Sequence, residues 1–144
     1  QGPVGPTGPA GATGSQGVVT YASAAGSGII TTTTAFFNPT VTLNLVAGQK
    51  VMLVQSNAFG ATSVAANGLN MYPCYKLSTG SITTVGLGIF GLTADILERN
   101  SYTINGVFVV PTTGSYTLGA CGSSLNAANW TNNEWGYVSV IVFN

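Results

Sequence analysis

Residues 41–56 read VTLNLVAGQKVMLVQS, two apolar segments separated by an Ala-Gly dipeptide. In the first segment apolar side chains alternate with polar ones, at Val41, Leu43 and Leu45. A period of two places successive side chains on opposite faces of an extended chain, so it predicts a β-strand with one buried face. A glycine after such an alternation is typical of a tight turn. These residues therefore predict two consecutive strands.

The same pattern extends in both directions from this pair, interrupted by the turn signals Asn67-Gly68, Thr79-Gly80 and 111–114. Residues 93–100 alone have a helical pattern, and we expect a solvated loop or turn there because three of the six charged residues fall within it. Short strands at this spacing predict an all-β, jelly-roll-like antiparallel β-sandwich for residues 19–144. The strands are expected at residues 18–22, 29–34, 41–46, 50–56, 69–77, 102–110, 115–122 and 136–143.

The first 17 residues, QGPVGPTGPAGATGSQG, have glycine at every third position. A strict Gly-X-Y repeat is the requirement of the collagen triple helix, because three chains meet at an axis that has no room for a side chain. We therefore expect residues 1–18 to form a collagen-like stalk and the protein to be a homotrimer; a flexible Gly/Pro linker is the alternative. The axis glycines are Gly2, Gly5, Gly8, Gly11, Gly14 and Gly17.

The chain starts at Gln1 in the middle of a triplet and without a methionine, so we interpret it as the C-terminal piece of a longer protein and residues 1–18 as the C-terminal end of a longer repeat. Proline occupies three X positions but no Y position. In this respect the repeat resembles the collagen-like surface proteins of bacteria, phages and viruses, which implies a secreted or cell-surface location. No apolar run approaches the ~20 residues of a membrane span, so membrane insertion is not expected.

Only 4% of the 144 residues are charged, with three Lys+Arg, three Asp+Glu and no histidine. An ordinary soluble domain has roughly a quarter of its residues charged. A neutral chain provides no cluster of cations for nucleic acid, so we expect no nucleic-acid partner. Without histidine, the commonest general base and metal ligand is missing. We therefore expect a protein that is not an enzyme.

A short motif, Phe108-Val-Val-Pro111-Thr-Thr-Gly114-Ser-Tyr116, resembles the F-x-x-P-x-x-G-x-Y signature of C1q/TNF-like trimeric heads. In those heads the aromatic residue ends one strand, Pro-x-x-Gly forms the turn, and the tyrosine begins the next strand. The resemblance implies a trimeric jelly-roll head behind a collagen stalk. Here the motif lies nearer the C-terminus than in that family, which leaves the strand order open.

Cys74 and Cys121 are the two cysteines, and each lies in an expected strand. A disulfide between them would close a loop of 47 positions; two buried, reduced thiols are the alternative. Two cysteines without a histidine cannot complete a structural zinc site, so no metal is expected there.

Residues 125–135, LNAANWTNNEW, combine aromatic and amide side chains. Trp130 and Trp135 offer flat apolar faces, and Asn129 and Asn132 offer neutral hydrogen-bonding groups, the materials of a carbohydrate contact. The alternative is that the tryptophans cover the end of the sandwich and the asparagines form turns.

Charged side chains suggest two further sites that would need three copies of the chain. Lys50, Lys76 and Arg99 would form a patch for a sulfated glycan if trimerisation brought them together. Three copies of one acid around the axis would hold Ca²⁺, but solvated carboxylates are the simpler interpretation and no cofactor is expected. The carboxylates are Asp95, Glu98 and Glu134.

These observations predict a non-enzymatic trimerisation and attachment head of a collagen-like surface protein. As an adhesin it would bind glycans of a host or of neighbouring cells, glycosaminoglycans among them. The alternative is a purely structural trimerisation cap of a spore, phage or viral fibre that has no ligand.

Overall fold

The structure is a computed structural model that describes residues 1–2, 4–5 and 17–144. Of the expected axis glycines, Gly8, Gly11 and Gly14 lie outside the described residues. In the single chain, a Cβ added at Gly2, Gly5 or Gly17 would meet no atom within 4 Å. Nothing within one chain therefore requires glycine at these three positions.

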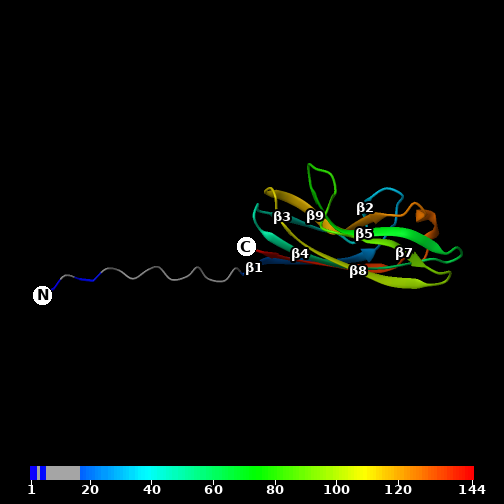
Figure 1. Cartoon of the computed structure of the whole chain (residues 1–144), viewed down its shortest axis with the longest axis horizontal. Helices are drawn as coiled ribbons and strands as arrows, with labels where there is room; N and C mark the ends of the chain where they lie inside the picture. Colours follow the sequence, from blue (N-terminus) through cyan, green and yellow to red (C-terminus); the bar gives the residue numbers. More distant parts are fainter. Residues whose placement is uncertain (3, 6–16) are drawn as a thin grey trace.

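Residues 18–143 form a sandwich of two antiparallel sheets (Figure 1). One sheet has four strands in the order β1-β10-β4-β8. The other has the order β2-β9-β5-β6, with β3 also paired to β9 and β7 also paired to β5. The elements are β1 (Val18–Ser27), β2 (Ala35–Phe36), β3 (Val41–Leu45), β4 (Lys50–Gly60), β5 (Ala66–Leu77), β6 (Thr83–Thr84), β7 (Ile89–Ala94), β8 (Arg99–Val109), β9 (Gly114–Ser123), the 3-10 helix η1 (Ala127–Asn129) and β10 (Trp135–Phe143).

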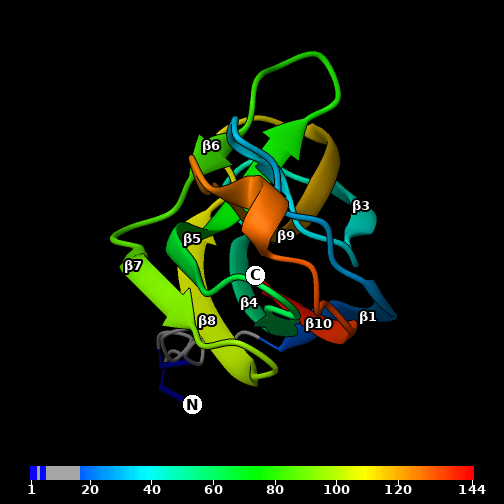
Figure 2. The ribbon, with the colours of Figure 1, turned by 90° about the vertical axis from the view of Figure 1, so that its right-hand side faces the viewer.

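The predicted all-β antiparallel sandwich is confirmed. Figure 2 looks along the sandwich and separates the layer of β1, β10, β4 and β8 from the layer of β9, β5 and β3. The first and last strands are neighbours, because β1 pairs with β10 from Val18 opposite Phe143 to Ser27 opposite Trp135. The other long edge of the four-stranded sheet is β8.

The strand expected at residues 29–34 is wrong, because this segment is a loop that ends before β2. Within the loop, the Thr31 hydroxyl donates to the Thr33 carbonyl at 2.6 Å; the Thr31 carbonyl accepts from the amide of Ser124, just after β9. Hydroxyl groups that bond to nearby backbone compete with a strand ladder. Ile30 is nevertheless buried in the core.

Asn67-Gly68 was expected to be a turn, and this is also wrong, because both residues lie inside β5. The pairing with β7 shifts register between Ala66 and Leu69, and Gly68 has a φ of 69°. A positive φ at a register shift is typical of a β-bulge, which glycine accommodates at little steric cost.

The turn expected within residues 93–100 exists, but without a helix: β7 ends at Ala94 and β8 begins at Arg99. Strands β6 and β7 were not predicted. Their pairing with β5 is short or irregular, so it leaves no sustained alternation in the sequence.

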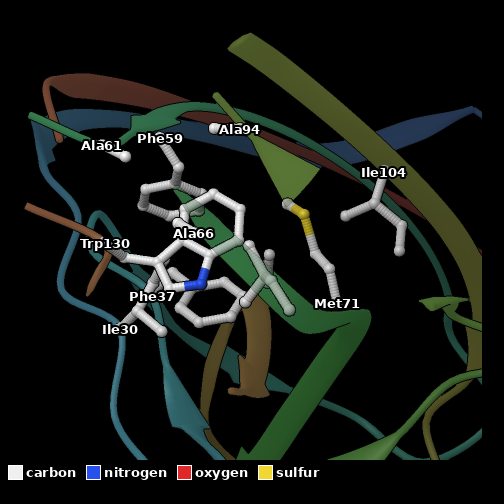
Figure 3. Packing of buried hydrophobic residues seen from close by; sticks show 11 residues of the cluster. Ile30, Phe37, Phe59, Ala61, Ala66, Met71, Ala94, Ile104 and Trp130 are labelled. Carbon is white, nitrogen blue, oxygen red and sulfur yellow. The ribbon is translucent and has the colours of Figure 1, made fainter. Parts of the chain in front are cut away.

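The interior contains two apolar clusters. The first contains Phe37, Phe59, Met71 and Trp130, and the indole of Trp130 lies over Phe37 and Phe59 (Figure 3). The second lies toward the other end of β4 and includes Leu53. Between them the inward positions of β4 are polar, at Gln55 and Asn57, whose side chains are fully buried.

Each side-chain nitrogen and oxygen of these buried amides has a hydrogen-bond partner, and the bonds connect the two sheets. The Gln55 side-chain oxygen accepts from the Ala120 amide at 2.6 Å, and its nitrogen donates to the Phe37 carbonyl at 3.2 Å and to the Asn57 side-chain oxygen at 2.7 Å. Asn57 in turn donates to the Asn38 carbonyl at 2.7 Å. These bonds supply partners to the irregular segment 37–40 between β2 and β3. Gln55 and Asn57 therefore hold this segment against β4.

Cys74 in β5 and Cys121 in β9 form a disulfide, with their Cα atoms 5.7 Å apart. The two residues lie on neighbouring strands, since Cys74 is opposite Gly119 and Cys121 is opposite Tyr72. Both are fully buried. The bond therefore crosslinks adjacent strands inside the sandwich.

Gln55→Ala is expected to lower the free energy of unfolding by about 2–4 kcal/mol, because it leaves several buried groups of β9, the 37–40 segment and Asn57 without their partner. Asn105→Ala, at an exposed position of β8, should change it by less than about 0.5 kcal/mol. Denaturant titration at one protein concentration measures both; equal effects would contradict a structural role for the buried amide.

The double variant Cys74→Ala/Cys121→Ala is expected to lose about 4 kcal/mol of stability, the loop-closure contribution for a separation of 47 residues. Thermal unfolding of wild type with and without a reductant, beside the variant, tests this. If reduction leaves the midpoint unchanged although mass spectrometry shows free thiols, the disulfide does not stabilise the head.

Candidate functional site

Trp130 is a core residue, and its burial disfavours the ligand-binding role expected for its side chain. Only 4% of its surface is exposed. The indole packs edge-on to Tyr102, with ring centroids 6.3 Å apart, and its Nε1 donates to the Asn67 carbonyl at 3.3 Å. Figure 3 shows it lying over Phe37 and Phe59. The alternative interpretation holds for this residue: it closes the end of the sandwich.

Asn129 and Asn132 use their amides within the protein. Asn129 donates to the Ala65 carbonyl at 3.2 Å, and Asn132 donates to the Glu98 carbonyl at 3.4 Å while its oxygen accepts from Arg99. These bonds tie the β9–β10 loop to the loops before β5 and before β8. Their arrangement favours the turn-forming interpretation over a ligand contact.

Arg99 is also engaged. Its Nη1 lies 2.6 Å from a carboxylate oxygen of Glu134, and its Nε donates to the Asn132 carbonyl at 3.1 Å. This ion pair holds the loop before β10 against the start of β8. An exposed pair of this kind contributes at most about 1 kcal/mol.

The three cations do not converge within one chain, so a cationic patch is not formed by a single copy. Lys50 begins β4, whereas Arg99 is opposite Gly60 at the other end of that strand, about 33 Å away at the rise of a β-strand. Lys76, near the end of β5, lies on the other sheet.

The acidic residues likewise form no cluster among the described residues, where no three His, Cys, Asp or Glu side chains come together as metal ligands. Of the expected calcium candidates, Asp95 and Glu98 lie in the loop before β8, and Glu134 is paired with Arg99. The expected calcium site would combine one acid from each of three copies, so a single chain does not test it.

The turn motif is structural in the head. Gly114 begins β9, and the hydroxyl of buried Tyr116 donates to the Thr112 carbonyl of the turn at 2.7 Å. Phe108 stacks on Tyr75 with ring centroids 4.5 Å apart. The residues that follow Pro111 thus fix the turn between β8 and β9 and anchor one end of the core.

Trp135 is the tryptophan that the structure leaves accessible, with 60% of its surface exposed. It is the first residue of β10 and lies beside a surface hollow of about 490 Å³. Residues 24–27 of β1 and residues 38–40 line the rest of this hollow. Sequence reasoning found Trp135 but not its neighbours; the small-residue run Ala24-Ala25-Gly26-Ser27 is the signal that could have indicated them.

The outward face of the four-stranded sheet carries an apolar row. Tyr21 is opposite Ile141, Ile141 is opposite Met52, and Met52 is opposite Val107, so one apolar side chain comes from each strand. Their exposed fractions lie between 36% and 78%. The charged residues in these four strands are Lys50 and Arg99, the first residues of β4 and β8. We call Tyr21, Ile141, Met52 and Val107 the apolar row.

Comparison with known proteins finds no matching family model and no matching curated protein. Two solved structures show a distant likeness. One is PliG, a periplasmic inhibitor of g-type lysozyme from Aeromonas hydrophila, at 18% identity over 86% of each chain and a TM-score of 0.40. The other is infectious bursal disease virus, Gx strain, at 13% identity over 88% of this chain and 32% of that chain, with a TM-score of 0.35. Similarity this low carries no argument about fold or function.

The disulfide indicates an oxidising compartment outside the cytoplasm, where such bonds form and persist. Within the described part of the chain, no helix has the length and apolarity needed to traverse a bilayer.

The two tryptophans are expected to differ in their effect on stability. Trp130→Ala should lower the free energy of unfolding by about 3–5 kcal/mol, because it leaves a cavity in the core. Trp135→Ala should lower it by less than about 1 kcal/mol, because that side chain is mostly in solvent. Chemical denaturation of the two variants checks this; similar losses would contradict the assignment of Trp135 to the surface.

Proposed function

We propose that this chain is the non-enzymatic trimerisation and attachment head of a collagen-like protein displayed on a surface or secreted. The observation that carries the proposal is the apolar row, together with the absence of charge in the middle of the four strands that bear it. Contiguous apolar surface of this kind is typical of protein interfaces.

A second and a third copy of the chain are the partners that the sequence favours. Gly17 is the last glycine of the Gly-X-Y repeat, and β1 begins at the next residue. Tyr21 of the apolar row is four residues from that glycine, about 13 Å along an extended chain. A triple helix would bring three copies of β1 together and raise the effective concentration of the heads.

A second apolar surface supports a ring in which each head contacts the next. Leu87, two residues before β7, is 91% exposed, and Phe90, the second residue of β7, is also exposed. The neighbouring Val85 lies beside Gly106 of β8, at the edge of the four-stranded sheet opposite β1. Two different surfaces that meet head to tail generate a closed ring when the rotation between copies closes. If the surface around Leu87 and Phe90 packed on the apolar row of the next copy, both apolar surfaces would be buried.

The attachment role is favoured by the hollow beside Trp135, which combines an exposed aromatic side chain with polar neighbours. A purely structural cap of a fibre remains the alternative function, in which the head assembles and binds no ligand. The disulfide and the low charge suit display outside the cell in either case.

Met52→Asp is expected to convert the trimer to a monomer, because it would bury three carboxylates in an apolar contact. Ser81→Asp, an equal charge change in the exposed loop between β5 and β6, should leave the trimer intact. Light scattering gives the mass of each, and circular dichroism shows that each is folded. A folded Met52→Asp variant with the same mass as the Ser81→Asp control would contradict this interface.

A further inference from the structure

We propose that the hollow beside Trp135 binds a neutral pyranose sugar, with the indole as its stacking platform. This inference deepens the attachment role proposed above and rests on it. It names one ligand chemistry and one place, and it moves the expected carbohydrate contact away from Trp130, Asn129 and Asn132.

The hollow is a shallow, open depression whose volume suits a small ligand. Its volume of about 490 Å³ falls within the roughly 300–1,000 Å³ that is usual for ligand sites. Ala24, Ala25 and Gly26 contribute side chains of at most one carbon, so the wall formed by β1 leaves room beside the indole. A flat aromatic face next to small residues can receive the C–H face of a sugar ring.

Polar groups suited to sugar hydroxyls border the same space. Ser27 and Thr40 supply hydroxyl groups and Asn38 supplies an amide, which together donate and accept hydrogen bonds. Among the strands that the structure describes, β1 pairs only with β10, so its other edge also presents backbone donors and acceptors. A sugar hydroxyl both donates and accepts, and this mixed set matches it.

The charge around the hollow indicates whether its ligand is a neutral or a sulfated sugar. The residues that line the hollow are all uncharged. Arg99 is paired with Glu134, and Lys50 lies at the opposite end of β4 from Arg99. No cation borders the hollow to compensate a sulfate or carboxylate, so the chemistry favours neutral hexoses over glycosaminoglycans.

The hollow is supported by rigid parts of the fold. The Asn38 carbonyl accepts from the buried Asn57, and the Phe37 carbonyl accepts from the buried Gln55. Trp135 is opposite Ser27 in the ladder, and the preceding Glu134 bonds to Ala58 and Gly28 through its backbone. Side chains held from behind in this way reach a ligand without the cost of ordering a loop.

The test uses the intact chain on an array of neutral mono- and oligosaccharides with heparin fragments beside them. The strongest neutral glycan is then titrated calorimetrically. We expect binding to at least one neutral glycan, weakened at least about tenfold in Trp135→Ala and partly restored in Trp135→Tyr. Tyr137→Ala is the matched control: this aromatic residue is 64% exposed, two positions further along β10 and outside the hollow.

Several outcomes would overturn the site. These are no neutral glycan bound, heparin bound in preference, equal loss in Trp135→Ala and Tyr137→Ala, or an extended peptide that binds along β1 in a Trp135-dependent way. A change of assembly mass in Trp135→Ala would show that another copy occupies the hollow. Light scattering on the same samples keeps the two proposals distinct: a trimer that binds no neutral glycan rejects this site alone, whereas a monomer that binds through Trp135 rejects trimerisation alone.

Discussion

The four-stranded sheet has apolar side chains on both of its faces, and this constrains the rest of the molecule. Its inward face packs on the second sheet through residues such as Val51, Leu53 and Val140. Its outward face carries the apolar row, which a single chain leaves in solvent. Burial of apolar area is the main favourable contribution to folding and association, about 25 cal/mol per Å². A sheet with two such faces is most stable when both are covered.

Inside the sandwich, buried backbone groups need hydrogen-bond partners, and two amide side chains supply them. The irregular segment 37–40 interrupts the edge of the second sheet, and the side chains of Gln55 and Asn57 reach across to bond to it. The disulfide then crosslinks β5 to β9 in the same layer. Residues 38–40 of this segment also line the hollow that we propose as a ligand site. The buried amides therefore support both the interior and the surface site.

Fold class could be predicted from the sequence because the long strands alternate strictly. Residues such as Val41, Leu43 and Leu45 have a pattern that a helix cannot use. The errors fall where local chemistry competes with pairing. Threonines 31–34 resemble a strand by composition, but the Thr31 hydroxyl bonds to the backbone of its own loop. Asn67-Gly68 resembles a turn but forms a bulge within β5.

The candidate site could be predicted only in part. Tryptophan and asparagine between β9 and β10 were a reasonable signal for a ligand, but sequence does not distinguish buried Trp130 from exposed Trp135. The difference arises because Trp130 faces the core at the end of the sandwich, whereas Trp135 begins a strand that alternates outward. The walls of the hollow come from residues about 100 positions away: the pairing of β1 with β10 brings residues 24–27 beside Trp135, and the bond from Asn57 holds residue 38.

The central claim is that the apolar row on the four-stranded sheet is covered by other copies of this chain. Native mass spectrometry of the intact wild-type protein over a dilution series tests it most directly. We expect one species of three times 14.6 kDa, about 44 kDa, that persists to low concentration. A species of one chain mass at every concentration, with the disulfide formed and the fold intact, would contradict it.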